Sequence, residues 1–185
     1  VVLGVGHSGT TILTKMISVL GWTVPDNDAD YYEPKEIRDA NIALLSGVPV
    51  DTVGLVRKLK AAWLVKDPRM VVTLPQWTEA IATTASKFGS PLLVWIVRDS
   101  CEVAKSYERR GEPTSDSHGG MSVADLEALA FRRYQEWPWA KVQFKYEDLA
   151  AAIGLWEPTK HEKERPTLVP CNHRGDQIGE VGCGC

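Results

Sequence analysis

Residues 1–20, VVLGVGHSGTTILTKMISVL, decide how the rest of this chain is expected to fold. Residues 1–5 are mostly apolar and have the length of a buried β-strand, and glycines stand at positions 4, 6 and 9. From position 12 the apolar spacing becomes helical, with one face formed by Ile12, Leu13, Met16, Ile17 and Leu20. The stretch predicts a strand, a glycine-rich loop and a helix, whose N-terminus and bare backbone N–H groups would bind an anion.

The spacing of the loop narrows the choice of anion. Gly4, Gly9 and Thr11 fit the phosphate-binding pattern G-x-x-x-x-G-K-[ST], but Thr10 takes the place of the lysine. Because that lysine reaches the β- and γ-phosphates in nucleoside triphosphatases, this loop is poorly equipped for ATP hydrolysis. We expect a different ligand with a 5′-phosphate group. The alternative is a tight strand-to-helix turn that binds nothing.

The whole chain has the composition of one globular domain. Its 185 residues are 44% hydrophobic and carry a net charge of −3, which does not favour a general binder of nucleic acid or of membrane surfaces. No apolar run reaches the length of a membrane span. Three of the four cysteines lie after residue 170, so a disulfide framework is not indicated. We expect a soluble protein of a reducing compartment, the cytoplasm.

Three further segments are predicted to be strands of a parallel sheet. Residues 92–97 (LLVWIV) are almost wholly apolar, as in a central strand that is buried on both faces, and residues 63–66 and 142–146 are further candidates. Ligands bind beyond the carboxyl ends of such strands, where Lys66 and Arg98 fall. The expected fold class is α/β, with a mostly parallel central sheet flanked by helices.

Helices are expected between these strands, from apolar periodicity and from start and stop signals. They cover residues 34–46, 50–62, 71–87, 101–110 and 122–137, with a short helix from residue 147. Ser100 is the expected N-cap of the helix over 101–110, and Gly111 its stop. Ser122 and Asp125 resemble a capping box.

Four segments, in this order, resemble the motifs of sulfotransferases that use 3′-phosphoadenosine 5′-phosphosulfate (PAPS). They are GVGHSGTTIL at residues 4–13, KDPR at 66–69, VRDSCEVAKS at 97–106 and KYEDL at 145–149. The resemblance covers about residues 1–152 and implies a P-loop-like three-layer fold. It also implies an enzyme that moves a sulfuryl group from PAPS to a hydroxyl or amine acceptor and releases 3′-phosphoadenosine 5′-phosphate (PAP).

The resemblance assigns a role to each part of the donor site. It implies that the 5′-phosphosulfate is held by Gly6, His7, Ser8, Gly9, Thr10 and Thr11. Arg98 and Ser106 would hold the 3′-phosphate, which ATP lacks. Family members often carry a lysine or arginine at the position of His7, which neutralises the bridging oxygen of the leaving PAP. In this chain a protonated His7 would take that role, with Lys66 or Lys15 as helpers.

The reaction also needs a general base, because the acceptor must lose a proton as it attacks sulfur. Glu33 lies in the region where bacterial-type family members carry an acid in a Y-x-E context, so it is the expected base. Asp30, Glu36 and His118 are the competing candidates. Alternatively, the acids around residue 33 only interact with the dipole of the helix that follows them.

The C-terminal residues differ from the rest of the chain. Residues 1–155 form the expected sulfotransferase-like α/β domain, and residues 156–170 have the polar, proline-containing composition of a linker. After the linker, Cys171, His173, Cys183 and Cys185 supply four soft ligands that suit a tetrahedral structural zinc ion. The alternative is a set of free or oxidisable thiols.

The sequence leaves the acceptor and two other functions open. The expected acceptor is a small molecule or a glycan, and no nucleic-acid partner is expected. A P-loop kinase or nucleoside triphosphatase would need a metal-binding aspartate at a strand end, for which Asp67 and Asp99 are candidates. A non-catalytic PAP-binding or interaction module would keep the donor site without the chemistry.

Overall fold

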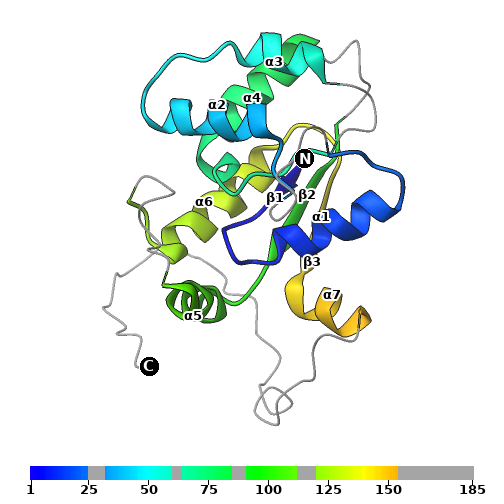
Figure 1. The fold of residues 1–185 in the computed structure, drawn as a ribbon, viewed down its shortest axis with the longest axis vertical. Helices are drawn as coiled ribbons and strands as arrows, with labels where there is room; N and C mark the ends of the chain where they lie inside the picture. The colour runs from blue at the N-terminus through cyan, green and yellow to red at the C-terminus, as the bar shows by residue number, and fades with distance from the viewer. Residues whose placement is uncertain (25–31, 60–63, 85–90, 112–119, 154–185) are drawn as a thin grey trace.

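The computed structural model describes residues 1–24, 32–59, 64–84, 91–111 and 120–153. Within these residues the chain forms three strands and seven helices, so the predicted mixed α/β class is confirmed (Figure 1). The elements are β1 (Val2–Leu3), α1 (Thr10–Val19), α2 (Lys35–Leu45), α3 (Thr52–Lys58), α4 (Met70–Thr84), β2 (Leu93–Val97), α5 (Ser100–Arg110), α6 (Val123–Glu136), β3 (Lys141–Lys145) and α7 (Tyr146–Ala152).

The three strands form a parallel sheet in the order β1-β2-β3, with the apolar β2 at its centre as predicted. The backbone of residues 64–66 lies beside β1. There the N–H of Val2 donates to the carbonyl of Val65 at 2.8 Å, and Val2 forms a parallel bridge with Lys66. The strand predicted at 63–66 is therefore a short paired segment, and Trp63 lies outside the described residues.

Helices cover both faces of the sheet, because successive strand residues point to opposite sides. Leu3 and Trp95 belong to a core that also contains side chains of α2, α3, α4, α5 and α6. Val94 and Ile96 belong to a second core, together with side chains of α1 and α7. Figure 1 shows this arrangement, with α1 and α7 to the right of the strands and α4, α5 and α6 to the left.

Most helix boundaries agree with the sequence signals. Ser122 caps α6 by accepting from the N–H of Asp125 at 3.1 Å, and Gly111 ends α5 with a left-handed backbone. The helix predicted over residues 50–62 is shorter, since α3 ends at Lys58. Its boundary follows from Leu59, whose backbone is extended and leads the chain away from the helix axis.

The N-cap predicted for α5 is wrong by one residue. The side chain of Asp99 caps the helix, and it accepts from the N–H groups of Cys101 and Glu102 at 3.0 and 3.3 Å. Ser100 is the first helical residue, and its hydroxyl donates to Glu127 of α6. A carboxylate can accept from two N–H groups at once, which leaves the hydroxyl to join the two helices.

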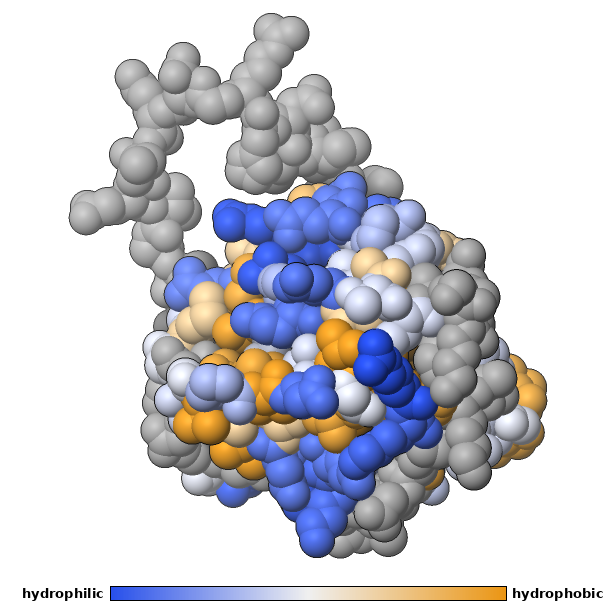
Figure 2. All heavy atoms as spheres, turned by 90° about the horizontal axis from the view of Figure 1, so that it is seen from above, coloured by the Kyte–Doolittle hydropathy of each residue, from blue (hydrophilic) through white to orange (hydrophobic). Residues whose placement is uncertain are grey.

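Exposed hydrophobic side chains are spread over several elements. They include Val19 and Leu20 at the end of α1, Ile42 on α2, Phe131 on α6 and Phe144 on β3. Figure 2 shows hydrophobic and hydrophilic side chains mixed on the face seen from above. This dispersion is ordinary for a globular surface. Among the described helices, none combines the length and the apolar character that a membrane span requires.

Candidate functional site

A cavity of about 620 Å³ lies where the carboxyl ends of the strands meet. The loop after β1 lines it with His7, and Arg98 and Tyr146 line it from the ends of β2 and β3. Lys66 lines it from the segment paired with β1. In a parallel sheet these ends share one edge, so four separate parts of the sequence reach the same space.

The glycine-rich loop presents the N-terminus of α1 to this cavity. His7 and Gly9 have positive φ values of 63° and 97°, which turn the chain from β1 into the helix. Among the described residues no side chain caps α1, and its first turn carries no acid. Thr10 and Thr11 line the cavity at this end. Backbone N–H groups at the start of α1 are therefore available to an anion.

Two loop positions need glycine because of close neighbours. A Cβ atom on Gly4 would lie 2.7 Å from the Oγ of Ser8 and 2.8 Å from the Cγ2 of Thr10. A Cβ atom on Gly9 would overlap the ring of Tyr146. The loop is thus packed tightly against the sheet and against the start of α7.

Gly9→Ala is expected to lower the free energy of unfolding by about 2–4 kcal/mol, because the added methyl meets Tyr146 in a strained backbone conformation. Gly21→Ala is the matched control. Gly21 has a similar φ of 94°, and beyond its two chain neighbours no described residue has an atom within 4 Å of the added Cβ. Gly21→Ala should therefore lower the free energy of unfolding only through the strained left-handed backbone, by about 1 kcal/mol. Urea unfolding measures both, and equal losses would contradict the packing of Gly9 against Tyr146.

The segments that carry Arg98 and Ser106 converge on His7. The guanidinium of Arg98 donates from Nη1 to the carbonyl oxygen of His7 at 3.0 Å. The hydroxyl of Ser106 lies 3.3 Å from Nδ1 of the same histidine. Arg98 also stacks on Tyr146, with its Cζ 4.3 Å from the ring centroid. These contacts hold the loop close to Arg98 and Ser106, the two residues that are expected to bind the 3′-phosphate.

Glu33, Lys66 and Arg69 form a largely buried ionic cluster on the other side of the loop. Lys66 is 2% exposed, and its Nζ donates to Oε1 of Glu33 at 2.8 Å and to Oγ1 of Thr11 at 3.3 Å. Nη1 of Arg69 lies 3.4 Å from Oε2 of Glu33. Lys66 therefore places an ammonium group at the start of α1, where the loop itself has no lysine.

A buried polar network holds the turn that carries Lys66 and Arg69. The carboxylate of Asp67 accepts from Asn41 Nδ2 and from Arg69 Nη1, both at 3.0 Å. Oδ1 of Asn41 accepts in turn from Thr73 at 2.6 Å and from Trp77 at 2.7 Å. Burial raises the pKa of Asp67, whereas the nearby Arg69 acts in the opposite direction. The network ties this turn to α2 and α4.

The structure brings most of the predicted site residues together. The cavity is lined by Gly6, His7, Gly9, Thr10, Thr11, Glu33, Lys66, Arg98 and Ser106. Ser8 is buried next to them, and its hydroxyl has no hydrogen-bond partner within the described part of the chain.

The other predicted candidates do not line the cavity or lie outside the described residues. Lys15 does not line the cavity, and its Nζ lies 5.2 Å from the ring centroid of Tyr32. Glu36 pairs with the exposed Lys58 at 3.7 Å. Asp30 and His118 lie outside the described residues.

Sequence reasoning missed several residues that line the cavity. Tyr146 belongs to the KYEDL segment, and its place at the end of a predicted strand is a signal that could have identified it. Arg109 and Arg110 follow Ser106 by three and four positions on α5, so helical spacing predicts all three on one face. Arg38 of α2 gave no comparable signal.

The residues predicted to bind zinc, Cys171, His173, Cys183 and Cys185, lie outside the described part of the chain. Within the described part, no group of three or more histidine, cysteine, aspartate or glutamate side chains could hold a metal ion. Structural zinc therefore stays a prediction from the sequence.

Comparisons with known proteins found no relative of this chain. The chain matches no family model, no curated protein and no solved structure among those compared with it. The function is therefore inferred from the motifs in the sequence and from the geometry of the cavity.

Proposed function

We propose that this protein is a PAPS-dependent sulfotransferase with a P-loop-like fold, acting on a small molecule or glycan in the cytoplasm. One observation carries the proposal: the start of α1, Lys66, Arg98 and Ser106 all meet at a single loop, although they come from distant parts of the sequence. This arrangement offers separate positive groups to the two ends of a nucleotide that is charged at its 5′ and 3′ positions.

The donor would be held at two places. The N–H groups at the start of α1 and the ammonium of Lys66 suit the phosphosulfate. The loop carries Thr10 where a P-loop has its lysine, and Lys66 would supply the missing positive charge. Arg98 and Ser106 suit the 3′-phosphate, since a guanidinium can bind phosphate oxygens through two parallel hydrogen bonds. When bound, PAPS supplies an activated sulfuryl group. Protein groups that hold and neutralise the leaving PAP would then provide most of the catalysis.

In the proposed step, a bond forms between the acceptor oxygen or nitrogen and sulfur, and the bond from sulfur to the bridging oxygen of PAP breaks. The acceptor proton passes to a base, for which we propose Glu33, whose carboxylate lines the cavity. Both of its oxygens also bind cations, so Glu33 has a second role in positioning Lys66 and Arg69. Lys66 and a protonated His7 would neutralise the charge that develops on PAP.

The two aspartates considered for a kinase have other partners. Asp67 is buried and binds Asn41 and Arg69, and Asp99 caps α5. Neither of them lines the cavity. A metal-dependent phosphotransferase is therefore supported less well than a sulfotransferase by the groups that surround the loop.

Transfer of label from [³⁵S]PAPS tests the proposed function. The full chain is incubated with labelled donor, without added metal, and with a panel of alcohols, phenols, amines, neutral saccharides and anionic saccharides. We expect label in one acceptor class and an equal amount of PAP. PAP binding without transfer to any acceptor would favour the non-catalytic module, and transfer of phosphate from ATP with magnesium would favour the kinase.

A further inference from the structure

Several of the basic side chains that line the cavity are held by acceptors from the protein itself. These pairs are Lys66 with Glu33, Arg69 with Glu33 and Asp67, Arg38 with Asp39, and Arg98 with the carbonyl oxygen of His7. Carboxylates therefore offset much of the positive charge at the end of the cavity where Lys66 lies. A ligand that approaches these cations meets groups whose donors are already partly used.

Arg109 and Arg110 also line the cavity, and they differ from the other cations in this respect. Both stand in the last turn of α5, and both are exposed. Within the described part of the chain, neither side chain makes a hydrogen bond or an ion pair. The dipole of α5 favours positive charge in its last turn, which accounts for the choice of basic residues but not for side chains that line a cavity.

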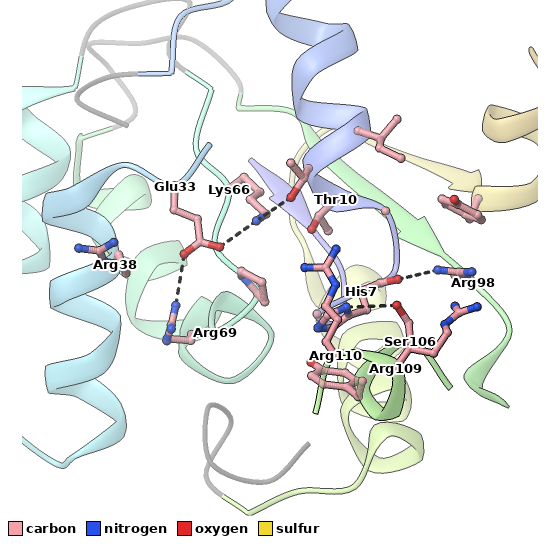
Figure 3. A pocket seen from close by; sticks show the side chains of 17 residues that line it. His7, Thr10, Glu33, Arg38, Lys66, Arg69, Arg98, Ser106, Arg109 and Arg110 are labelled. Carbon is pink, nitrogen blue, oxygen red and sulfur yellow. Dashed lines mark hydrogen bonds and ion pairs between the residues drawn. The ribbon is translucent and has the colours of Figure 1, made fainter. Parts of the chain in front are cut away.

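The two arginines reach different parts of the cavity. In Figure 3 the side chain of Arg109 extends toward Arg98, at the end where the 3′-phosphate is expected. The side chain of Arg110 extends toward Thr10, the first residue of α1. Arg110 follows Ser106 by four positions, so both stand on the face of α5 that borders the loop. The guanidinium of Arg110 thus points toward the helix start that is expected to hold the phosphosulfate.

The groups that face each other at this place are all hydrogen-bond donors. A guanidinium has five N–H groups and no acceptor. The first N–H groups of α1 have no intrahelical partner, and no described side chain caps them. Donors cannot satisfy one another, so Arg110 and the start of α1 can be joined only through an acceptor between them. An anion with several oxygens has the required chemistry.

We propose that Arg110 is a further catalytic residue, which binds the oxygens of the sulfuryl group while the first N–H groups of α1 bind the adjoining phosphate. In the transfer step, the bond from sulfur to the bridging oxygen breaks, its electron pair stays on PAP, and the acceptor forms the new bond to sulfur. Arg110 keeps its proton throughout and donates hydrogen bonds to the sulfuryl oxygens as the charge is redistributed. The inference rests on the proposed function, because it names the residue that holds the transferred group.

Calorimetric titrations with PAPS and with PAP, both without acceptor, isolate this contact, because only PAPS carries the sulfuryl group. We expect Arg110→Gln to weaken PAPS binding by about tenfold, the effect of losing a charge-assisted hydrogen bond. PAP binding should change by less than about threefold, since PAP lacks the group that Arg110 binds. Arg110→Lys keeps the charge without the planar fork and should recover part of the loss. Arg132→Gln is the control, since Arg132 is exposed on α6 and does not line the cavity.

The transfer assay gives an independent measurement on the same variants. Arg110→Gln should lower kcat by about 10²-fold, the usual cost of losing one group that stabilises developing charge. The urea midpoint of unfolding should stay close to that of wild type, because Arg110 loses no partner within the described part of the chain.

The outcomes separate the inference from the proposed function. Equal losses of PAPS and PAP affinity in Arg110→Gln, or no loss of either, would overturn the inference and leave the proposed function intact. A loss confined to PAPS with an unchanged kcat would also overturn it, because Arg110 would then bind the donor without taking part in the transfer. Absence of PAP and PAPS binding to the wild-type chain would overturn the proposed function, and the inference with it.

Discussion

Lys66→Met is expected to lower the rate of sulfuryl transfer by about 10²- to 10³-fold, the usual cost of losing one group that stabilises developing charge. We expect a large effect because the Lys66 ammonium lies 3.3 Å from Oγ1 of Thr11, at the start of α1, where it would take the place of the lysine that the loop lacks. The affinity for PAP should fall less, by about tenfold, since the backbone N–H groups of α1 remain. Release of PAP from PAPS in the presence of acceptor measures the rate, and calorimetry measures the affinity.

A second variant separates this loss from misfolding. Removal of Lys66 alone leaves Glu33 buried beside only one of its two cations. Breaking a buried ion pair by removing one partner lowers the free energy of unfolding by about 3–5 kcal/mol. Lys66→Met combined with Glu33→Gln removes the unpaired charge and should restore much of that stability. Because Glu33 is also the proposed base, the transfer rate cannot report on Lys66 in this variant, so PAP affinity is measured instead and should stay about tenfold below that of wild type. PAP affinity restored to that of wild type in the double variant would show that Lys66 only stabilises the fold.

Arg98→Ala is expected to remove the preference for a 3′-phosphorylated nucleotide. PAP affinity should fall by about 10- to 100-fold, because a charged hydrogen-bond partner of the phosphate is lost. Arg98 also fixes the carbonyl of His7 and stacks on Tyr146, so some weakening will extend to every nucleotide that binds the loop. The ratio of PAP affinity to 5′-ADP affinity isolates the 3′-phosphate contact.

The ratio of the two affinities also defines the result that would contradict this prediction. Calorimetric titrations with PAP and with 5′-ADP should give affinities that differ strongly in wild type and nearly agree in Arg98→Ala. Arg132→Ala serves as the control for the loss of one arginine, and its ratio should match that of wild type. An unchanged ratio in Arg98→Ala would show that the 3′-phosphate is bound elsewhere, for which Arg109, on the same side of the cavity, is an alternative (Figure 3).

The parts of the fold that depend on local sequence were predicted well. β2 was found as an apolar run and α6 from its capping box, because both signals act within a few residues. The N-cap of α5 was assigned to the wrong residue, because the choice between Asp99 and Ser100 depends on Glu127 in another helix. That partner lies 27 positions away from Ser100 and has no local signature.

The candidate site shows the same division between local and distant effects. Strand ends predicted that Lys66 and Arg98 would lie at one edge of the sheet, and both line the cavity. The ion pair from Lys66 to Glu33 was not predicted, since a pairing across 33 positions depends on the packing of α2. Tyr146 was missed for a similar reason, because its contact with Arg98 exists only when β2 and β3 are neighbours.

The measurement that tests the central claim most directly is a calorimetric titration of the wild-type chain with PAP in the absence of metal, and separately with 5′-ADP and magnesium. A donor site for PAPS is expected to bind PAP tightly without metal, and to bind ADP much more weakly with or without magnesium. Equal affinities for the two nucleotides, or binding of ADP only with magnesium, would contradict it and leave the cavity as the site of a different nucleotide.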